Sequence, residues 1–399
     1  MSNTAAKRVG KSGKLKANSR LLPKDIHSFV NSLVEEDFHA KRVLSISHAV
    51  TGVIHGASLG IHAIGQGMAQ ARGLNPKHAI KQADRLLSNN GLVVDEFFAH
   101  WVRYIIGQRE EVVLALDWTE FDTDDHSTIA LYLLTSHGRA TPLLWKSVTK
   151  STIEGWRNEH EDCLLELFAK LRPASVKRAT VLADRGFGDQ KLYSYLASLG
   201  LDYIIRFRGL IQVESSQGEK RPAAKWLSPS GRAITLLNAK VTTKRTEVAA
   251  VVCVHASGMK EAWFLASSRA DLKGAEIIKL YVKRFTIEET FRDTKDARFG
   301  LGLKATHIGD PARRDRLLII AAISQSLLCL LGAAAEETGF DAMLRANTVK
   351  RRTHSLFTQG CYWYGAIPNM PDEWLEELMA AFGRLICQQS VFTEIFGIL

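Results

Sequence analysis

Three carboxylates, Asp117, Asp184 and Glu288, could together carry out metal-dependent phosphoryl chemistry. The first two each end an apolar run typical of a buried strand, EVVLALD and ATVLAD, where a carboxylate would sit on a rigid scaffold. Taken singly, each aspartate is better explained as a strand end that starts a turn. Together, three converging carboxylates would repel one another unless divalent cations neutralised them. Oxygen ligands without histidine or cysteine favour Mg²⁺, with Mn²⁺ as the alternative. Two such ions, about 4 Å apart, would activate the attacking oxygen and stabilise the leaving oxygen of a phosphodiester.

The stretch YVKRFTIEETFRDTK, residues 281–295, predicts a helix with four polar side chains on one face. At about 100° per residue, Tyr281, Arg284, Glu288 and Lys295 fall within an arc of about 60°. The simpler explanation is an Arg–Glu pair at i,i+4 on a solvated surface. That explanation does not account for Tyr281, or for an acid with cations on both sides. Cations flanking a metal-binding carboxylate would instead hold phosphates on either side of a scissile bond.

The pattern around these residues predicts an α/β fold, a mixed sheet flanked by helices. In chain order we expect strands at 111–117 and on either side of 136–138, a helix at 153–171, a strand ending at 184, a short helix, a strand within 201–209, a β-rich insertion at 210–271, a long helix at 273–297, an apolar helix at 313–336 and a largely helical tail. The sheet would then position both aspartates, and the long helix would position Glu288.

Residues 22–105 are predicted to be helical, with two short helices joined at 72–76. Asn75 could cap the second of these helices and Pro76 could begin it. One face would expose the cations and the histidine, while the opposite face would be apolar; the exposed set is Lys77, His78, Lys81 and Arg85. Helix-turn-helix proteins that bind DNA have this layout. On this segment alone, an ordinary helical pair with a solvated basic face is the slightly better explanation.

Basic residues also gather near both ends of the chain. Residues 1–20 carry six Lys or Arg and no acid, which is typical of a flexible arm at 1–21 that either aids solubility or contacts phosphates. Lys350, Arg351 and Arg352 precede several aromatic residues in a segment, 342–371, without Asp or Glu. Interleaved basic and aromatic residues suit nucleic acid, although an aromatic contact between helices would look similar.

The composition is that of a globular protein of two or three domains, with 399 residues, 46% hydrophobic and 24% charged. A net charge of +10 favours a polyanionic partner, nucleic acid or an anionic membrane, or serves solubility alone. Five scattered cysteines without metal-ligand spacing favour a reducing compartment, and neither GxGxxG nor a P-loop supports nucleotide use. The uncharged run at 317–335 resembles a membrane span, but polar residues within it favour a buried core helix.

The residues quoted above match a known family pattern. Tyr281, Arg284, Glu288 and Lys295, with DWT at Asp117 and ADRGF at Asp184, resemble the signature of DDE transposases of bacterial insertion-sequence family 4, which includes the Tn-five- and Tn-ten-type enzymes. The resemblance implies an RNase H-like fold. It divides the chain into a basic arm at 1–21, an all-α DNA-binding domain at 22–105, a catalytic domain at 106–209 and 272–340, the β-rich insertion at 210–271, and a helical region for DNA contact and dimerisation at 341–399.

The same resemblance implies functions for single residues. Asp117, Asp184 and Glu288 would be catalytic and would bind two Mg²⁺ ions, while Tyr281, Arg284 and Lys295 would contact DNA. Trp263 would stack on a base flipped out during hairpin formation, although it could simply be a buried strand residue.

The implied reaction is cut-and-paste transposition by a cytoplasmic bacterial enzyme, without a membrane partner. It binds terminal inverted repeats as a homodimer, cleaves them through a hairpin intermediate and joins the 3′ ends to target DNA. The alternatives are an RNase H-like nuclease or resolvase, and a catalytically silent DNA-binding protein descended from a transposase.

Overall fold

The structure is a computed structural model that describes residues 23–34, 38–296, 298, 300–387 and 397. The arm predicted at 1–21 lies outside these residues. Hydrogen bonds join the described strands into one sheet with the order β3-β2-β1-β4-β5-β10-β9-β8-β6-β7. The strands are β1 (Glu111–Phe121), β2 (His126–Leu134), β3 (Ala140–Thr149), β4 (Arg178–Ala183), β5 (Asp202–Arg206), β6 (Gln212–Glu214), β7 (Lys220–Pro222), β8 (Ile234–Val241), β9 (Thr246–Val254) and β10 (Trp263–Ser267).

The first five strands form the mixed part of the sheet. β1, β2 and β3 pair antiparallel through two short turns, and β4 and β5 run parallel to β1 after helical crossovers. β10 returns antiparallel against β5, so the β-rich segment after β5 extends the same sheet. With helices on its flanks, this is an RNase H-like α/β fold, as the sequence predicts.

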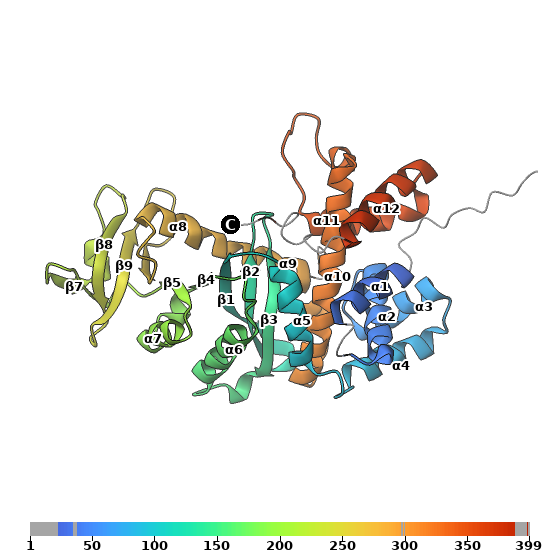
Figure 1. Ribbon diagram of the computed structural model, residues 1–399, viewed down its shortest axis with the longest axis horizontal. Helices are drawn as coiled ribbons and strands as arrows, with labels where there is room; N and C mark the ends of the chain where they lie inside the picture. The colour runs from blue at the N-terminus through green and yellow to red at the C-terminus, as the bar shows by residue number, and fades with distance from the viewer. Residues whose placement is uncertain (1–22, 35–37, 297, 299, 388–396, 398–399) are drawn as a thin grey trace, which may run out of the picture.

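The helices cover the sheet and build both ends of the chain. They are α1 (Pro23–Val34), α2 (Ala40–Gly56), α3 (Ile61–Arg72), α4 (Pro76–Leu87), α5 (Val94–Ile106), α6 (Arg157–Leu171), α7 (Gln190–Ser198), α8 (Gly274–Val282), α9 (Thr286–Lys295), α10 (Pro311–Glu337), α11 (Leu356–Ala366) and α12 (Asp372–Cys387). In Figure 1, α10 stands between the sheet and α1–α4, while β7–β9 lie at the opposite end of the molecule.

Alternation along β1 assigns its two faces to different helices. Trp118 points to α6, where its indole N–H donates to Glu161 at 2.8 Å. Thr119, the next residue, points to the other face and accepts a hydrogen bond from Lys295 at the end of α9. Asp117 shares the face of Thr119, because side chains two residues apart lie on the same side of a strand.

α10 is the described helix that is long and apolar enough to cross a membrane, and 89% of its most apolar window is buried in the protein. The prediction of a buried core helix is therefore confirmed. Gly332 of α10 and Gly360 of α11 let the two backbones touch, since a Cβ on Gly360 would lie 1.8 Å from the carbonyl oxygen of Leu328. A helix enclosed by β3, α2, α11 and α12 has to be apolar on every side.

Local signals place the helical pair correctly. α3 ends at Arg72, and Asn75 caps α4 by accepting a hydrogen bond from the backbone N–H of Lys77.

The prediction of a single long helix over 273–297 is wrong in one respect. A 3₁₀ turn at Lys283–Phe285 separates α8 from α9. Because such a turn advances about 120° per residue rather than 100°, it rotates α9 relative to α8.

Candidate active site

The register between β1 and β4 brings Asp117 and Asp184 level with each other. Leu116 pairs with Ala183 at the end of this parallel ladder, and the two aspartates are the next residue on each strand. The sequence predicts that Asp117 ends its strand, and this prediction is wrong, because β1 continues to Phe121 against β2. Asp184 does follow the end of β4, and its side chain accepts a hydrogen bond from the N–H of Gly186 at 2.7 Å.

Glu288 supplies the third carboxylate from the first turn of α9, where its side chain is exposed. Burial raises the pKa of Asp117 to about 6, Arg284 opposes that rise, and the charges of Asp184 and Glu288 add to it. The three carboxylates therefore act on one another electrostatically, although they come from two strands and a helix. Like charges in a half-buried site are what a bound cation would neutralise.

Arg284 now balances the charge of Asp117. Its Nη2 donates to Oδ2 of Asp117 at 3.0 Å, and the N–H of Trp118 donates to Oδ1 at 3.0 Å. Within the described part of the chain, no three His, Cys, Asp or Glu side chains are gathered closely enough to hold a metal ion. The donor chemistry fits a hard divalent cation, and Asp117 is held by a guanidinium instead.

An aromatic cluster lies beside Arg284. The ring of Trp263 stacks on Phe285 at 5.6 Å between centroids and meets the edge of Tyr281 at 5.2 Å. Tyr281 is buried, which raises its pKa to about 12, whereas Phe285 is 37% exposed. Sequence reasoning missed Phe285, yet its position four residues after Tyr281, next to Arg284, was a usable signal.

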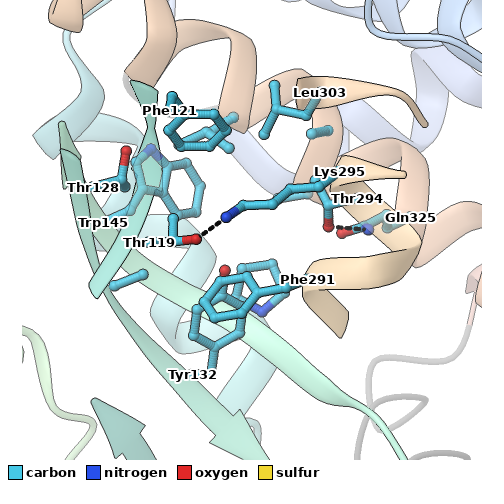
Figure 2. A pocket seen from close by; sticks show the side chains of 15 residues that line it. Thr119, Phe121, Thr128, Tyr132, Trp145, Phe291, Thr294, Lys295, Leu303 and Gln325 are labelled. Atoms are coloured by element: carbon cyan, nitrogen blue, oxygen red, sulfur yellow. Dashed lines mark hydrogen bonds between the residues drawn. The ribbon is translucent and has the colours of Figure 1, made fainter. Parts of the chain in front are cut away.

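Lys295 points into the protein and not into solvent. Figure 2 shows its side chain entering a small cavity of about 30 Å³ between α9, α10 and the first three strands. The ammonium donates to the hydroxyl of Thr119 and lies 4.8 and 5.1 Å from the ring centroids of Phe121 and Phe291. Burial, reinforced by the charge of Lys304, lowers the pKa of Lys295 to about 8.

The basic residues of the N-terminal helices lie elsewhere. Lys77, Lys81 and Arg85 are exposed along α4, as the helical pattern predicts. Beside them runs an open groove of about 700 Å³, whose lining includes His78, Lys81 and Arg85 of α4 and Ser45 of α2. No carboxylate lines this groove, so it presents only positive and neutral groups. In Figure 1, α10 separates α4 from the sheet.

The segment before α11 carries the third basic group. Lys350 and Arg351 are exposed. Arg352 is tied to the protein, because its Nη2 donates to the carbonyl oxygen of His137 at 2.8 Å and its Nη1 lies 3.4 Å from Glu336. The structure thus aligns Asp117 with Asp184 and pairs Asp117 with Arg284, which lies next to the Trp263 cluster through Phe285, while Glu288 acts on Asp117 through its charge. It leaves α4 and residues 350–351 as separate surfaces.

Comparison with known proteins identifies the family. The family model described as "Transposase DDE domain" matches residues 108–325, more than half of the chain, and this segment contains Asp117, Asp184 and Glu288. This protein belongs to the DDE transposase family. Its partner is therefore DNA, and the family generally uses divalent metal ions.

Two further comparisons add little to this DDE transposase. A cryo-EM structure of a piggyBac transposase synaptic complex with hairpin DNA is similar at a TM-score of 0.42 and 9% sequence identity, covering 91% of this chain and 78% of that one. A search of curated proteins finds no match. The family match over residues 108–325 carries the assignment of this transposase.

Proposed function

We propose that this transposase belongs to the insertion-sequence family 4 type, binds the terminal inverted repeats of its element and moves it by cut-and-paste. The observation that carries the proposal is the alignment of Asp117 with Asp184 at the end of the β1–β4 ladder, with Glu288 acting on the same carboxylate. Asp117, Asp184 and Glu288 would hold two Mg²⁺ ions. Bound there, the ions supply an activated attacking oxygen and a stabilised leaving oxygen.

The chain's own side chains would position the DNA around that site. Arg284 and Lys295 would contact phosphates next to the scissile bond, the former from a buried turn and the latter after leaving its cavity. Phe285 and Trp263 form a stacked pair in which Phe285 is 37% exposed, which suits a base displaced from the duplex during hairpin formation. Tyr281 packs behind Trp263 and would hold that ring in place.

Separate basic surfaces would bind the rest of the terminal repeat. The groove along α4, lined in part by Lys81 and Arg85, lacks acidic lining and suits the DNA backbone, and Lys77 is exposed on the same helix. Lys350 and Arg351, with Arg352, would contact DNA from the segment before α11. We propose the domain division stated above, with 22–105 for end binding and 341–399 for DNA contact and dimerisation, in a homodimer acting in the bacterial cytoplasm.

The test is incubation of the protein with Mg²⁺ and a donor plasmid that carries the terminal repeats flanking its own gene. We expect excised linear DNA with hairpin ends, followed by joining of opened ends to a target plasmid. Glu288→Gln is the control that should bind the ends without cleaving them. Cleavage without joining would indicate a nuclease or resolvase, and end binding without cleavage by the unaltered protein would indicate a silent DNA-binding protein.

A further inference from the structure

The ion pair between Arg284 and Asp117 occupies the centre of the proposed metal site. The side chain of Arg284 is 6% exposed and that of Asp117 is 18% exposed, so little water screens the contact. Breaking such a buried pair without replacing either partner is strongly unfavourable, since it leaves an uncompensated charge. Arg284 comes from the 3₁₀ turn between α8 and α9, just before the helix that carries Glu288.

This pair competes directly with a metal ion for the same oxygens. Oδ2 of Asp117 accepts from Arg284, and Oδ1 accepts from the N–H of Trp118, each at 3.0 Å. A divalent cation that uses Asp117 would have to displace the guanidinium, which also repels it by charge. Of the two hydrogen bonds, that from Arg284 is the one a side-chain rotation can release, because Trp118 donates from the backbone of β1.

Arg284 also has an unused donor. Its Nε is buried and has no hydrogen-bond partner, although its Nη2 is engaged by Asp117. A guanidinium binds phosphate best through two parallel N–H groups, such as Nε and Nη2. A phosphate of bound DNA could therefore satisfy both groups at once, which the single contact with Asp117 does not do. DNA thus offers Arg284 a better partner and frees Asp117.

We propose that Arg284 is a positioning residue that makes metal binding depend on DNA. Without DNA it holds Asp117 and opposes the entry of a divalent cation. With a DNA end in place, it moves to a phosphate and leaves Asp117 open for the ion. The inference rests on the proposed function of the site. Because coupling between two ligands is reciprocal, metal should also tighten DNA binding, and such couplings typically amount to about 5- to 150-fold.

The experiment measures Mn²⁺ binding by electron paramagnetic resonance of the free ion, which does not depend on turnover. The full chain is titrated alone and with a precleaved terminal-repeat duplex ending in a 3′-dideoxynucleotide, and the duplex alone is subtracted. We expect the unaltered protein to bind Mn²⁺ about tenfold or more tightly with the duplex. Asp117→Asn should lose this DNA-dependent site, which identifies the site being measured.

Arg284→Gln removes the competing charge while keeping a side chain of similar length. We expect this variant without DNA to bind Mn²⁺ about tenfold more tightly than the unaltered protein, with little further gain from DNA. Arg185→Gln is the matched control. It removes an exposed arginine next to Asp184 that pairs with Glu261 and does not contact Asp117, so its dependence on DNA should be unchanged.

Equal Mn²⁺ affinity of the unaltered protein with and without DNA would overturn the proposal, and so would full DNA dependence in Arg284→Gln. If circular dichroism shows that Arg284→Gln is unfolded, Arg284→Lys decides. Lysine keeps the charge but lacks the fork, so its DNA-dependent gain should be reduced, and an unchanged gain would overturn the proposal. Cleavage of donor DNA with DNA-independent Mn²⁺ binding would sink only this inference. Absence of both Mn²⁺ binding and cleavage would sink the proposed function as well.

Discussion

Lys295→Met should stabilise the DNA-free protein, although Lys295 lies beside the candidate active site. Its ammonium is buried against a neutral hydroxyl and two aromatic rings, and burial lowers its pKa from 10.5 to about 8. Each pKa unit corresponds to about 1.4 kcal/mol, so holding this charge inside costs the folded state about 3 kcal/mol at pH 7. Methionine fills a similar volume without a charge and should recover most of that free energy of unfolding.

The pH dependence gives the sign of the effect. A pKa that is lower in the folded state means that the unfolded chain binds more protons between about pH 8 and 10.5. The unaltered protein should therefore gain stability as the pH rises through this window, until Lys295 is neutral in both states. The advantage of Lys295→Met should be complete below about pH 8 and should shrink towards zero near pH 10.5.

Urea unfolding at pH 7 and pH 10 measures this advantage, with Lys279→Met as the control because Lys279 is exposed on α8 and is not among the groups that shift the pKa of Lys295. Lys295→Met should also weaken binding of the terminal repeat and reduce the salt dependence of that binding by about one phosphate contact. The buried-charge explanation would be refuted if Lys295→Met were less stable than the unaltered protein at pH 7. It would also be refuted if the gain in free energy of unfolding were the same at both pH values. An unchanged salt slope would refute the phosphate contact.

Three further predictions address the site and its support. Glu288→Gln should retain end binding while strand cleavage in Mg²⁺ is lost, and near-normal cleavage would refute the metal assignment. Trp263→Ala should impair hairpin formation more than the first nick, because Phe285 loses the ring on which it stacks; equal loss of both steps would show that the stacking role is misplaced. Arg316→Met should lower the free energy of unfolding, measured by urea denaturation, by about 2–3 kcal/mol. The reason is that Arg316 is buried and donates to the carbonyl of Leu87 at 2.8 Å and to Asn90 at 2.9 Å. Arg313→Met, which removes partly exposed contacts with Asp84 and the hydroxyl of Ser88, should change this free energy by under about 1 kcal/mol, and similar losses in both variants would contradict the role of burial.

Local chemistry made part of this structure predictable. Asn75 and Pro76 mark the start of α4 because capping and the fixed φ of proline act within one turn. Apolar runs identified β1 and β4, and with them Asp117 and Asp184. The exact end of β1 could not be predicted from the sequence. Its last residues, TEF, alternate between polar and apolar, and they form a strand because they pair with β2.

The direction of the helix stripe was beyond the sequence for a different reason. A helical wheel that assumes about 100° per residue places Tyr281, Arg284, Glu288 and Lys295 on one face. Nothing in the residue types indicates the 3₁₀ turn at Lys283–Phe285. That turn adds about 60° of rotation over three residues, and it separates buried Tyr281 and Arg284 from exposed Glu288. The residues that could do chemistry were therefore identifiable, whereas their partners depended on tertiary packing.

α10 links α4 to α9, the two elements to which we assign DNA contacts, and its sequence is explained by that position. At its start, Arg316 holds the end of α4, while Asp315 accepts from the backbone N–H of Ser147 on β3 at 2.9 Å. Further along, Gln325 donates to Thr294 at 2.6 Å, next to Lys295. Polar and charged residues thus occur where α10 contacts polar groups of neighbouring elements, and apolar residues fill the rest of its enclosed length. If the proposed end binding on α4 is correct, a single long helix between α4 and α9 would hold that end at a fixed distance from the carboxylates, as cleavage at a defined phosphodiester requires.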